Sequence, residues 1–256
     1  DGGHYEKSPM YHSIITKDLI ELLDLLKKIK LISYSDYISF LENKIDKYLN
    51  FYNYICHPDN LPSFFADTNF DNSYSLTTLK SLAHNVMGKS KFLKSKDNLK
   101  IFKTSGYFSF MNDNYYCSGD IGDFYKTDQP GHSHAASLSF ELTLFGERVF
   151  VNSGISNYQD NQQRYFERST KAHNTLEIDH SNSSQVWKSF RLGNRAKIIS
   201  YNYKRTDEYY EINAEHDGYS TNNNSVIHNR AWSFYKKEIK ITDTVRGNFQ
   251  SARARY

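Results

Sequence analysis

The hydrophobic periodicity of the chain changes near residue 95, and this change limits the folds open to it. In residues 1–95 apolar side chains recur at i, i+3, i+4 and i+7, which favours amphipathic helices. From about Lys100 onward, short aromatic stretches with period-two alternation are separated by polar turns, which favours antiparallel strands. Helices followed by many strands predict an α+β protein, with residues 1–95 helical and residues 96–256 an antiparallel β-sandwich.

Three helices are expected in the first part. The first begins after Ser8, which suits an N-cap, with Pro9 at the first helical position. Ser35-Asp36 resembles an N-cap for the second helix, and a third, weaker one covers residues 75–87. The apolar face of the first helix is formed by Tyr11, Ile14, Ile15, Leu19, Leu22, Leu23, Leu26 and Ile29.

A hairpin is the clearest signal in the second part. Residues 137–144 alternate with period two, a turn follows at Phe145-Gly146-Glu147, and residues 148–154 form the returning strand. Further strands are expected at residues 107–110, 114–117, 174–178, 196–200, 209–214 and 237–241.

Composition narrows the classes of partner. The net charge is +3, from 32 basic and 29 acidic residues, which does not favour a nucleic-acid partner. No run approaches the roughly 18 apolar residues of a membrane span. Two cysteines, Cys56 and Cys117, make no disulfide framework. The 21 tyrosines suit a wet, sugar-binding surface, although compositional bias is the favoured explanation for most of them.

The ends of the sequence suggest a piece of a longer protein. The chain begins at Asp1 without Met and stops at Tyr256 in strand-like sequence. We therefore expect an internal fragment whose sandwich is truncated.

Histidines mark the most informative polar segment, Gly131-His132-Ser133-His134. On a strand these two imidazoles would point to the same face. Asn152 and His173 follow, and two or three imidazoles with an oxygen ligand would suit Zn²⁺. Imidazoles hydrogen-bonded within a polar sheet are the alternative.

Two further clusters carry candidate functional groups. Residues 1–12 form a polar loop ahead of the first helix and include Glu6 and Tyr11. The segment 164–175 contains Arg164, Tyr165 and Arg168, and arginine can bind a carboxylate through two hydrogen bonds. A capped helix start and a solvated charged loop are the alternative interpretations.

These motifs, in this order, resemble the heparinase II/III family of polysaccharide lyases, and the resemblance covers nearly the whole chain. The segments that carry it are Asp1-Gly2-Gly3-His4-Tyr5-Glu6-Lys7-Ser8-Pro9-Met10-Tyr11-His12, Pro130-Gly131-His132-Ser133-His134-Ala135, Leu138-Ser139-Phe140-Glu141-Leu142, Val151-Asn152-Ser153-Gly154 and Ser169-Thr170-Lys171-Ala172-His173-Asn174-Thr175.

The resemblance implies a fold, a reaction and roles for individual residues. It implies that residues 1–95 are the end of an α/α toroid and that the chain cleaves uronic-acid polysaccharides by β-elimination. It makes Tyr11 the general acid, and in some members also the base, with His132 assisting. Glu6, Arg164, Tyr165 and Arg168 would bind substrate, and His134, Asn152 and His173 would hold one divalent metal ion, with zinc the best match. The residue that neutralises the substrate carboxylate, an Asn or His, would precede Asp1.

The sequence departs from the family pattern at two positions. Asn152 stands where many members have a ligating Asp, and Ala136 stands where an Asp commonly follows His-Ala. A neutral amide supplies no charge to a cation, so these changes weaken the case for a metal.

Three hypotheses remain open at this point. The leading one is a polysaccharide lyase acting on an acidic polysaccharide, with the bacterial periplasm or cell envelope favoured by the resemblance. The second is a non-catalytic glycan-binding or surface-polysaccharide assembly protein on the same scaffold. The third is a metal-dependent hydrolase built on His132, His134 and His173. The sequence leaves the polysaccharide and the oligomeric state open.

Overall fold

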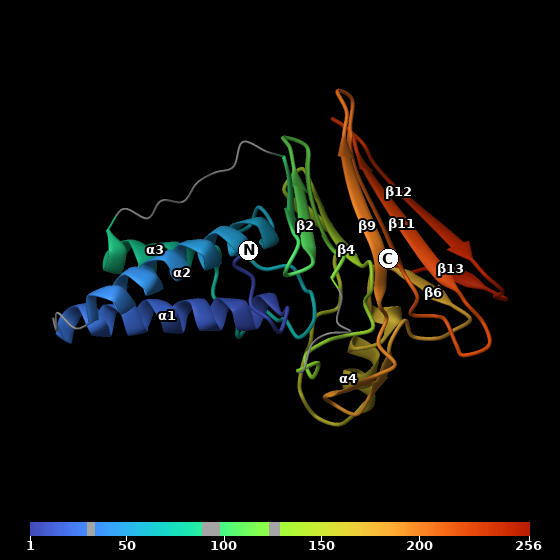
Figure 1. Ribbon diagram of the computed structural model, residues 1–256, viewed down its shortest axis with the longest axis horizontal. Coiled ribbons are helices and arrows are strands. Elements are labelled where there is room, and N and C mark those ends of the chain that lie inside the picture. Colours follow the sequence, from blue (N-terminus) through green and yellow to red (C-terminus); the bar gives the residue numbers. More distant parts are fainter. Residues whose placement is uncertain (30–33, 89–97, 123–128) are drawn as a thin grey trace.

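The computed structural model describes residues 1–29, 34–88, 98–122 and 129–256. A group of helices lies beside two stacked antiparallel sheets, with the helices on one side of the first sheet (Figure 1). The α+β class with antiparallel sheets is therefore confirmed. The predicted domain boundary near residue 95 lies outside the described residues. The assignment of the helices to an α/α toroid stays a prediction.

The helices are α1 (Pro9–Ile29), α2 (Ser35–Ile55) and α3 (Leu76–Met87). Their apolar faces meet in one core that includes the fully buried Leu23, Ile45 and Leu79. The predicted start of α1 is confirmed, because Ser8 Oγ accepts the Tyr11 N–H at 3.2 Å. The predicted cap of α2 is wrong, since Ser35 is already helical and Tyr34 precedes it without a capping hydrogen bond.

Thirteen strands are described. The first sheet has the order β1-β2-β3-β4-β5, and the second has the order β12-β11-β10-β9. Two short pairs, β13 with β6 and β7 with β8, complete the fold. The strands are β1 (Leu99–Phe102), β2 (Tyr107–Met111), β3 (Tyr115–Asp120), β4 (Phe140–Leu144), β5 (Glu147–Phe150), β6 (Leu176–Ile178), β7 (Gln185–Trp187), β8 (Arg191–Gly193), β9 (Ile198–Arg205), β10 (Tyr210–His216), β11 (Ile227–Phe234), β12 (Ile239–Arg246) and β13 (Ala252–Ala254). A short helix, α4 (Gln162–Glu167), and a 3₁₀ turn, η2 (Thr170–Ala172), lie between β5 and β6.

Aromatic side chains fill the space between the two large sheets. Phe110 of β2 stacks on Phe234 of β11 with ring centroids 4.5 Å apart, and Phe108 meets Trp232 edge to face at 4.9 Å. All four are buried, and burial of such a side chain contributes about 1.5–3 kcal/mol. This core fixes the second sheet against the first.

The predicted hairpin of β4 and β5 is confirmed. Its two turn residues, Phe145 and Gly146, both have left-handed backbone angles, with φ of 50° and 90°. Two such residues form the tight turn whose twist matches that of the flanking strands.

β11 and α4 were not expected from the sequence. The inward positions of β11 alternate His228, Arg230, Trp232 and Phe234, so half of its buried face is polar and hides the strand pattern. Residues 164–167 of α4 lie inside the segment 164–175, which resembled a charged loop.

The polar half of β11 belongs to a buried chain of hydrogen bonds. The Arg230 guanidinium and His228 Nε2 both contact the Asp243 carboxylate on β12, at 2.7–2.9 Å. His228 Nδ1 lies 3.0 Å from His216 Nε2 on β10. Arg230 Nη1 also donates to the carbonyls of Leu138 and Asn174, so the second sheet holds two segments that flank the histidine motifs.

A buried carboxylate of the first sheet holds the helical part. Glu141 of β4 accepts the backbone N–H groups of Phe64 and Asn152 at 2.8 and 3.0 Å, and contacts His57 Nε2 at 2.8 Å. The loop that follows α2 is therefore anchored on the sandwich.

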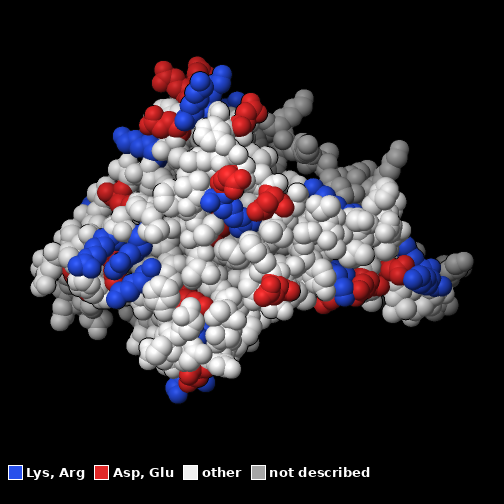
Figure 2. All heavy atoms as spheres, turned by 180° about the vertical axis from the view of Figure 1, so that it is seen from behind, with Lys and Arg blue, Asp and Glu red and all other residues white. Residues whose placement is uncertain are grey.

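Other sequence expectations have simple outcomes. Cys56 and Cys117 are buried free thiols. In the described ranges no helix combines the length and the apolarity needed to cross a bilayer. Basic and acidic side chains are interspersed over the face drawn in Figure 2, apart from a small basic group near its left edge.

Asp243→Asn should destabilise the fold at neutral pH by about 3–5 kcal/mol, because Arg230 would stay buried without its counter-ion. Burial raises the pKa of Asp243, but His228 and Arg230 outweigh it and hold that pKa below its usual range. The ionised carboxylate therefore stabilises the fold above the unfolded pKa of about 3.9, and this contribution is lost as pH falls through the folded pKa.

Urea unfolding should thus show that the wild type has a larger free energy of unfolding than Asp243→Asn, and that this difference becomes smaller below about pH 4. His216 and His228, whose pKa values burial lowers, destabilise both proteins as pH falls below about 6.5. Asp71→Asn, at an exposed aspartate, is the matched control and should change little. An equal effect of both substitutions would contradict this account.

Candidate active site

Tyr11 and His132 lie against each other where the helices meet the sandwich. Tyr11 is the third residue of α1, and His132 lies in the loop that precedes β4. Their rings stack with centroids 4.2 Å apart and planes 13° apart. The structure thus brings together the two residues to which the family resemblance assigns a catalytic role, although they are far apart in the chain.

Other polar and aromatic groups surround this pair. The Tyr158 hydroxyl lies 2.8 Å from the Tyr11 hydroxyl, and Glu6 Oε2 lies 3.2 Å from His132 Nδ1. Tyr158 also stacks on Phe190 at 5.6 Å. The side chains of His132 and Glu6 are 22% and 17% exposed, and Phe190 is 46% exposed, so the cluster reaches solvent.

Burial is the largest cause that raises the pKa of Tyr158 well above its usual value, and the hydrogen bond with Tyr11 is the second. Tyr158 therefore keeps its proton and can donate it to the Tyr11 oxygen.

The expectation that His132 and His134 share one face of a strand is wrong. Residues 131–139 form an irregular segment, and Leu138 within it has a left-handed φ of 59°. His132 turns to Tyr11, whereas His134 is buried and contacts Asp67 and His173.

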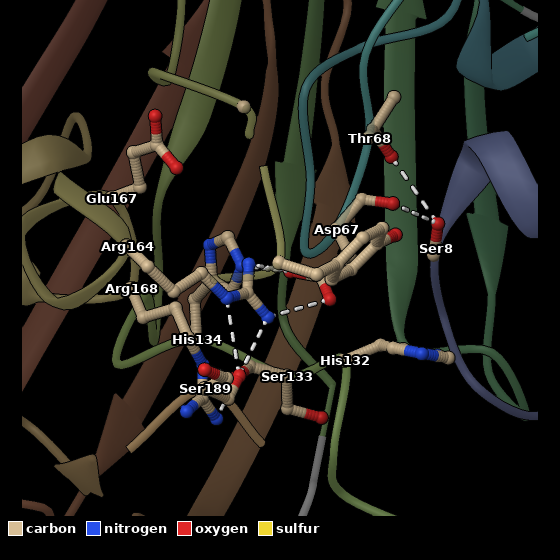
Figure 3. A network of polar contacts seen from close by, with 12 residues as sticks. Ser8, Asp67, Thr68, His132, Ser133, His134, Arg164, Glu167, Arg168 and Ser189 are labelled. Carbon is tan, nitrogen blue, oxygen red and sulfur yellow. Dashed lines mark hydrogen bonds and ion pairs between the residues drawn. The ribbon is translucent and has the colours of Figure 1, made fainter. Parts of the chain in front are cut away.

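Asp67 joins the helical part to the sandwich, and its importance was not recognised from the sequence. It lies in the loop between α2 and α3 and is fully buried. Its carboxylate accepts two hydrogen bonds from Arg164, at 2.5 and 2.8 Å, and lies 2.7 Å from His134 Nε2. Its backbone N–H donates to the His132 carbonyl at 3.1 Å. Figure 3 shows these groups converging from separate parts of the chain.

The same loop also sets the start of α1. Ser8 Oγ donates to the Asp67 carbonyl at 2.6 Å while it caps the helix that carries Tyr11 (Figure 3). Asp67 therefore fixes the backbone of both Tyr11 and His132. Burial raises the pKa of the Asp67 carboxyl, but His134 and Arg164 outweigh this effect and keep it below the usual value, so the group is ionised.

The structure corrects the expectation that Arg164 and Arg168 grip the substrate, because both guanidinium groups are buried and bonded within the protein. Arg164 binds Asp67 and the Ser189 carbonyl, and its charge lies 5.2 Å from the centre of the Tyr158 ring. Arg168 donates to the Ser133 carbonyl. Burial and the neighbouring Arg164 lower the pKa of Arg168 to about 10, so it stays charged at neutral pH. Both arginines therefore hold neighbouring segments of the site in place through hydrogen bonds within the protein.

The remaining predicted substrate-binding residues have different positions. Tyr165, on α4, donates its hydroxyl proton to the exposed carboxylate of Asp160. Glu6 contacts His132, as described above, so its place is beside a catalytic candidate. Substrate binding by either residue stays a prediction.

Two of the three predicted metal ligands meet. His134 Nε2 and His173 Nδ1 each lie 2.7 Å from an acceptor-only oxygen, of Asp67 and of the Ser169 carbonyl, so these nitrogens carry the protons. The unprotonated nitrogens then face each other, His134 Nδ1 and His173 Nε2 being 3.1 Å apart. Burial lowers both pKa values, that of His173 to about 3, so neither ring gains a proton readily. Two converging lone pairs fit a cation.

The third predicted ligand fits less well. Asn152 Oδ1 accepts the Asn174 N–H at 3.1 Å, and Asn152 Nδ2 is buried without a hydrogen-bond partner in the described part of the chain. Among those same residues, no group of three or more His, Cys, Asp or Glu is placed to hold a metal. The donor set is therefore two imidazoles and at most one neutral amide oxygen.

Asp67→Asn should reduce the free energy of unfolding by about 3–5 kcal/mol, because it leaves the Arg164 charge buried and unpaired. Urea unfolding measures this loss, and Asp71→Asn on the same loop is the exposed control. A loss below about 1 kcal/mol would show that Asp67 does not hold the two parts together.

Comparisons with known proteins agree with this architecture. A family profile described as "Heparinase II/III-like, C-terminal" matches residues 94–254. A search of curated proteins gives no significant match.

Solved structures share the fold at low sequence identity. The structure titled "Heparinase III-BT4657 gene product" superposes with a TM-score of 0.74 at 21% identity, over 96% of this chain and 39% of that one. A heparinase III gives 0.73 at 22% identity, over 97% and 40%. Heparan sulfate lyase HepC from Pedobacter heparinus gives 0.69 at 17% identity, over 96% and 39%. The chain thus spans about two-fifths of the length of these proteins. Because the family profile matches more than half of its residues, the chain belongs to the heparinase II/III-like family.

Proposed function

We propose that the chain provides the acid–base part of a polysaccharide lyase that cleaves an acidic, uronate-containing glycan by β-elimination. The observation that carries the proposal is the stacked pair of Tyr11 and His132, with the Tyr158 hydroxyl 2.8 Å from that of Tyr11. The proteins with similar folds include a heparan sulfate lyase, which supports an acidic glycan as substrate.

β-Elimination needs three things from an active site. A base removes the proton at C5 of the uronate, the C5–H electron pair forms the C4–C5 double bond, and the C4–O bond breaks as an acid protonates the leaving oxygen. Because the C5 proton is weakly acidic, the neighbouring carboxylate must also be neutralised and the developing enolate stabilised.

The geometry suits Tyr11 for proton transfer at C5 and O4. A tyrosine with a pKa near 10 acts readily as an acid, and acts as a base when nearby donors favour its phenolate. Tyr158, which keeps its proton, is such a donor. His132, stacked on Tyr11, is the second proton-transfer group.

Glu6 has a positioning role in this proposal. A carboxylate only accepts, so the contact with Glu6 Oε2 favours a proton on His132 Nδ1 and leaves Nε2 as the free acceptor. The residue that neutralises the substrate carboxylate would come from a segment ahead of Asp1, as the family resemblance implies.

Tyr11→Phe in the full-length protein should abolish the unsaturated, ultraviolet-absorbing product formed from a panel of uronate polymers, lowering kcat by at least about 10²-fold. Tyr37→Phe, at an exposed tyrosine on α2, is the control and should retain activity. A full-length wild type that forms no unsaturated product would contradict the proposal. A product that gained water would instead favour the hydrolase.

Glu6→Ala should lower kcat about 10- to 100-fold with a much smaller change in KM, because it removes the group that orients His132. Glu6→Gln keeps an acceptor oxygen and should recover part of the activity. If Glu6 bound the substrate instead, KM would rise with kcat little changed.

We also propose that His134 and His173 hold one divalent cation, with zinc the best match to two imidazoles. A bound cation would take up the two facing lone pairs and would supply Lewis acidity and positive charge at this buried pair of imidazoles. The protein's own contribution is to hold both rings in one tautomer through Asp67 and the Ser169 carbonyl.

Zinc should therefore raise the Tm of the wild type, and His173→Ala should remove that shift. His84→Ala, on the helical part, is the control. An equal zinc shift in the wild type and His173→Ala would exclude this site.

A further inference from the structure

A hollow lies at the other end of the sandwich from the candidate active site. Its volume is about 410 Å³, and it opens where the β2–β3, β9–β10 and β11–β12 turns meet. In Figure 1 this is the upper end of the sheets, whereas α4, which carries Arg164, lies at the lower end. Neither the family resemblance nor the acid–base chemistry uses this place.

Aromatic rings form the inner surface of the hollow. Tyr209 and Tyr235 lie with ring centroids 5.1 Å apart and planes tilted by 34°, and both side chains are half-buried. The stacked, buried pair of Phe110 and Phe234 forms the base, next to Tyr210. Lys204 Nζ lies 5.3 Å from the centre of the Tyr209 ring, and both tyrosine rings keep part of their surface in solvent.

Hydrogen bonds within the protein hold the turns around the hollow in this shape. Asn114 Nδ2 donates to the Lys236 carbonyl at 2.8 Å, and the Tyr115 hydroxyl donates to the Tyr235 carbonyl at 2.6 Å. Thr206 closes the β9–β10 turn by accepting the Tyr209 N–H at 3.1 Å. A preformed site loses little conformational entropy when it binds a ligand.

The rim of the hollow combines acceptors and donors. Asp113, Asp207 and Glu208 line it and are exposed, and their carboxylates accept no hydrogen bond from the described residues. Arg205, held over the Tyr210 ring at 5.2 Å, and Lys236 supply donors. Three negative and two positive groups leave a slight excess of negative charge, which disfavours a sulfated or carboxylated polymer.

We propose that this hollow is a second carbohydrate-binding site, which takes an uncharged hexopyranose unit of a glycan. The pyranose C–H face would lie on Tyr209 or Tyr235, and the sugar hydroxyls would donate to the carboxylates and accept from Arg205. The inference goes beyond the lyase proposal and stands independently of it, because no residue of the hollow takes part in the acid–base chemistry.

The test is titration calorimetry and saturation-transfer NMR of the chain with neutral oligosaccharides of glucose, galactose and mannose, and with a heparan sulfate oligosaccharide. Tyr209→Ala should weaken binding of a neutral oligosaccharide at least about tenfold, since it removes a stacking surface. Glu208→Gln, which preserves shape, should weaken it less. Tyr203→Ala, at a 52% exposed tyrosine on β9 that does not line the hollow, is the matched control.

The predicted result is saturable binding of at least one neutral oligosaccharide that depends on Tyr209 but not on Tyr203 or Tyr11. Each of three results would overturn the proposal. These are no binding of any neutral probe up to about 10 mM, equal weakening by Tyr209→Ala and Tyr203→Ala, or a Tyr209-dependent preference for the sulfated probe. Tyr11→Phe tests the lyase alone, so the two proposals can fail separately.

Discussion

The ion pair between Asp67 and Arg164 is the interaction on which the arrangement of the candidate site depends. Asp67 belongs to the helical part and Arg164 to the sandwich, and both are fully buried. Glu141 makes the reciprocal connection, since it is a sandwich carboxylate that accepts hydrogen bonds from the loop after α2. The loop is thus held at two points by buried carboxylates, one its own and one from the sheet, and Ser8 ties α1 to it.

These buried charged contacts determine the geometry of the site more than they stabilise the fold. Removing two charges from water costs several kcal/mol per ion, and a good ion pair returns roughly that amount. This favourable interaction depends on one arrangement, because the carboxylate of Asp67 has all its partners only when Arg164 and His134 both reach it. The second sheet adds the same kind of restraint through Arg230, whose guanidinium holds the carbonyls of Leu138 and Asn174. The histidine segments are irregular, so these buried restraints replace the order that a regular strand would have given them.

Local patterns in the sequence predicted local structure well. The helices, the Ser8 cap and the β4–β5 hairpin follow from spacing, capping and turn chemistry, each of which acts within a few residues. What the sequence could not show depends on distant partners. Asp67 and Arg164 are 97 residues apart, and nothing near either one marks the pair.

Burial of charge also misled the sequence interpretation. The segment with Arg164 and Arg168 has the composition of a solvated loop, yet both guanidinium groups are buried. The sequence pattern did not predict β11, because His228 and Arg230 occupy inward positions that usually hold apolar side chains. In each case a polar residue is buried with its partners around it, which a pattern of apolar spacing cannot reveal.

The central claim is that the phenol of Tyr11 and the imidazole of His132 act as one unit on the same sugar ring. A double-mutant cycle on kcat, with Tyr11→Phe, His132→Ala and the combined variant in the full-length protein, measures this most directly. The account predicts that the combined variant is about as impaired as the worse single variant. Losses that multiply would mean that the two groups act independently, and would contradict it.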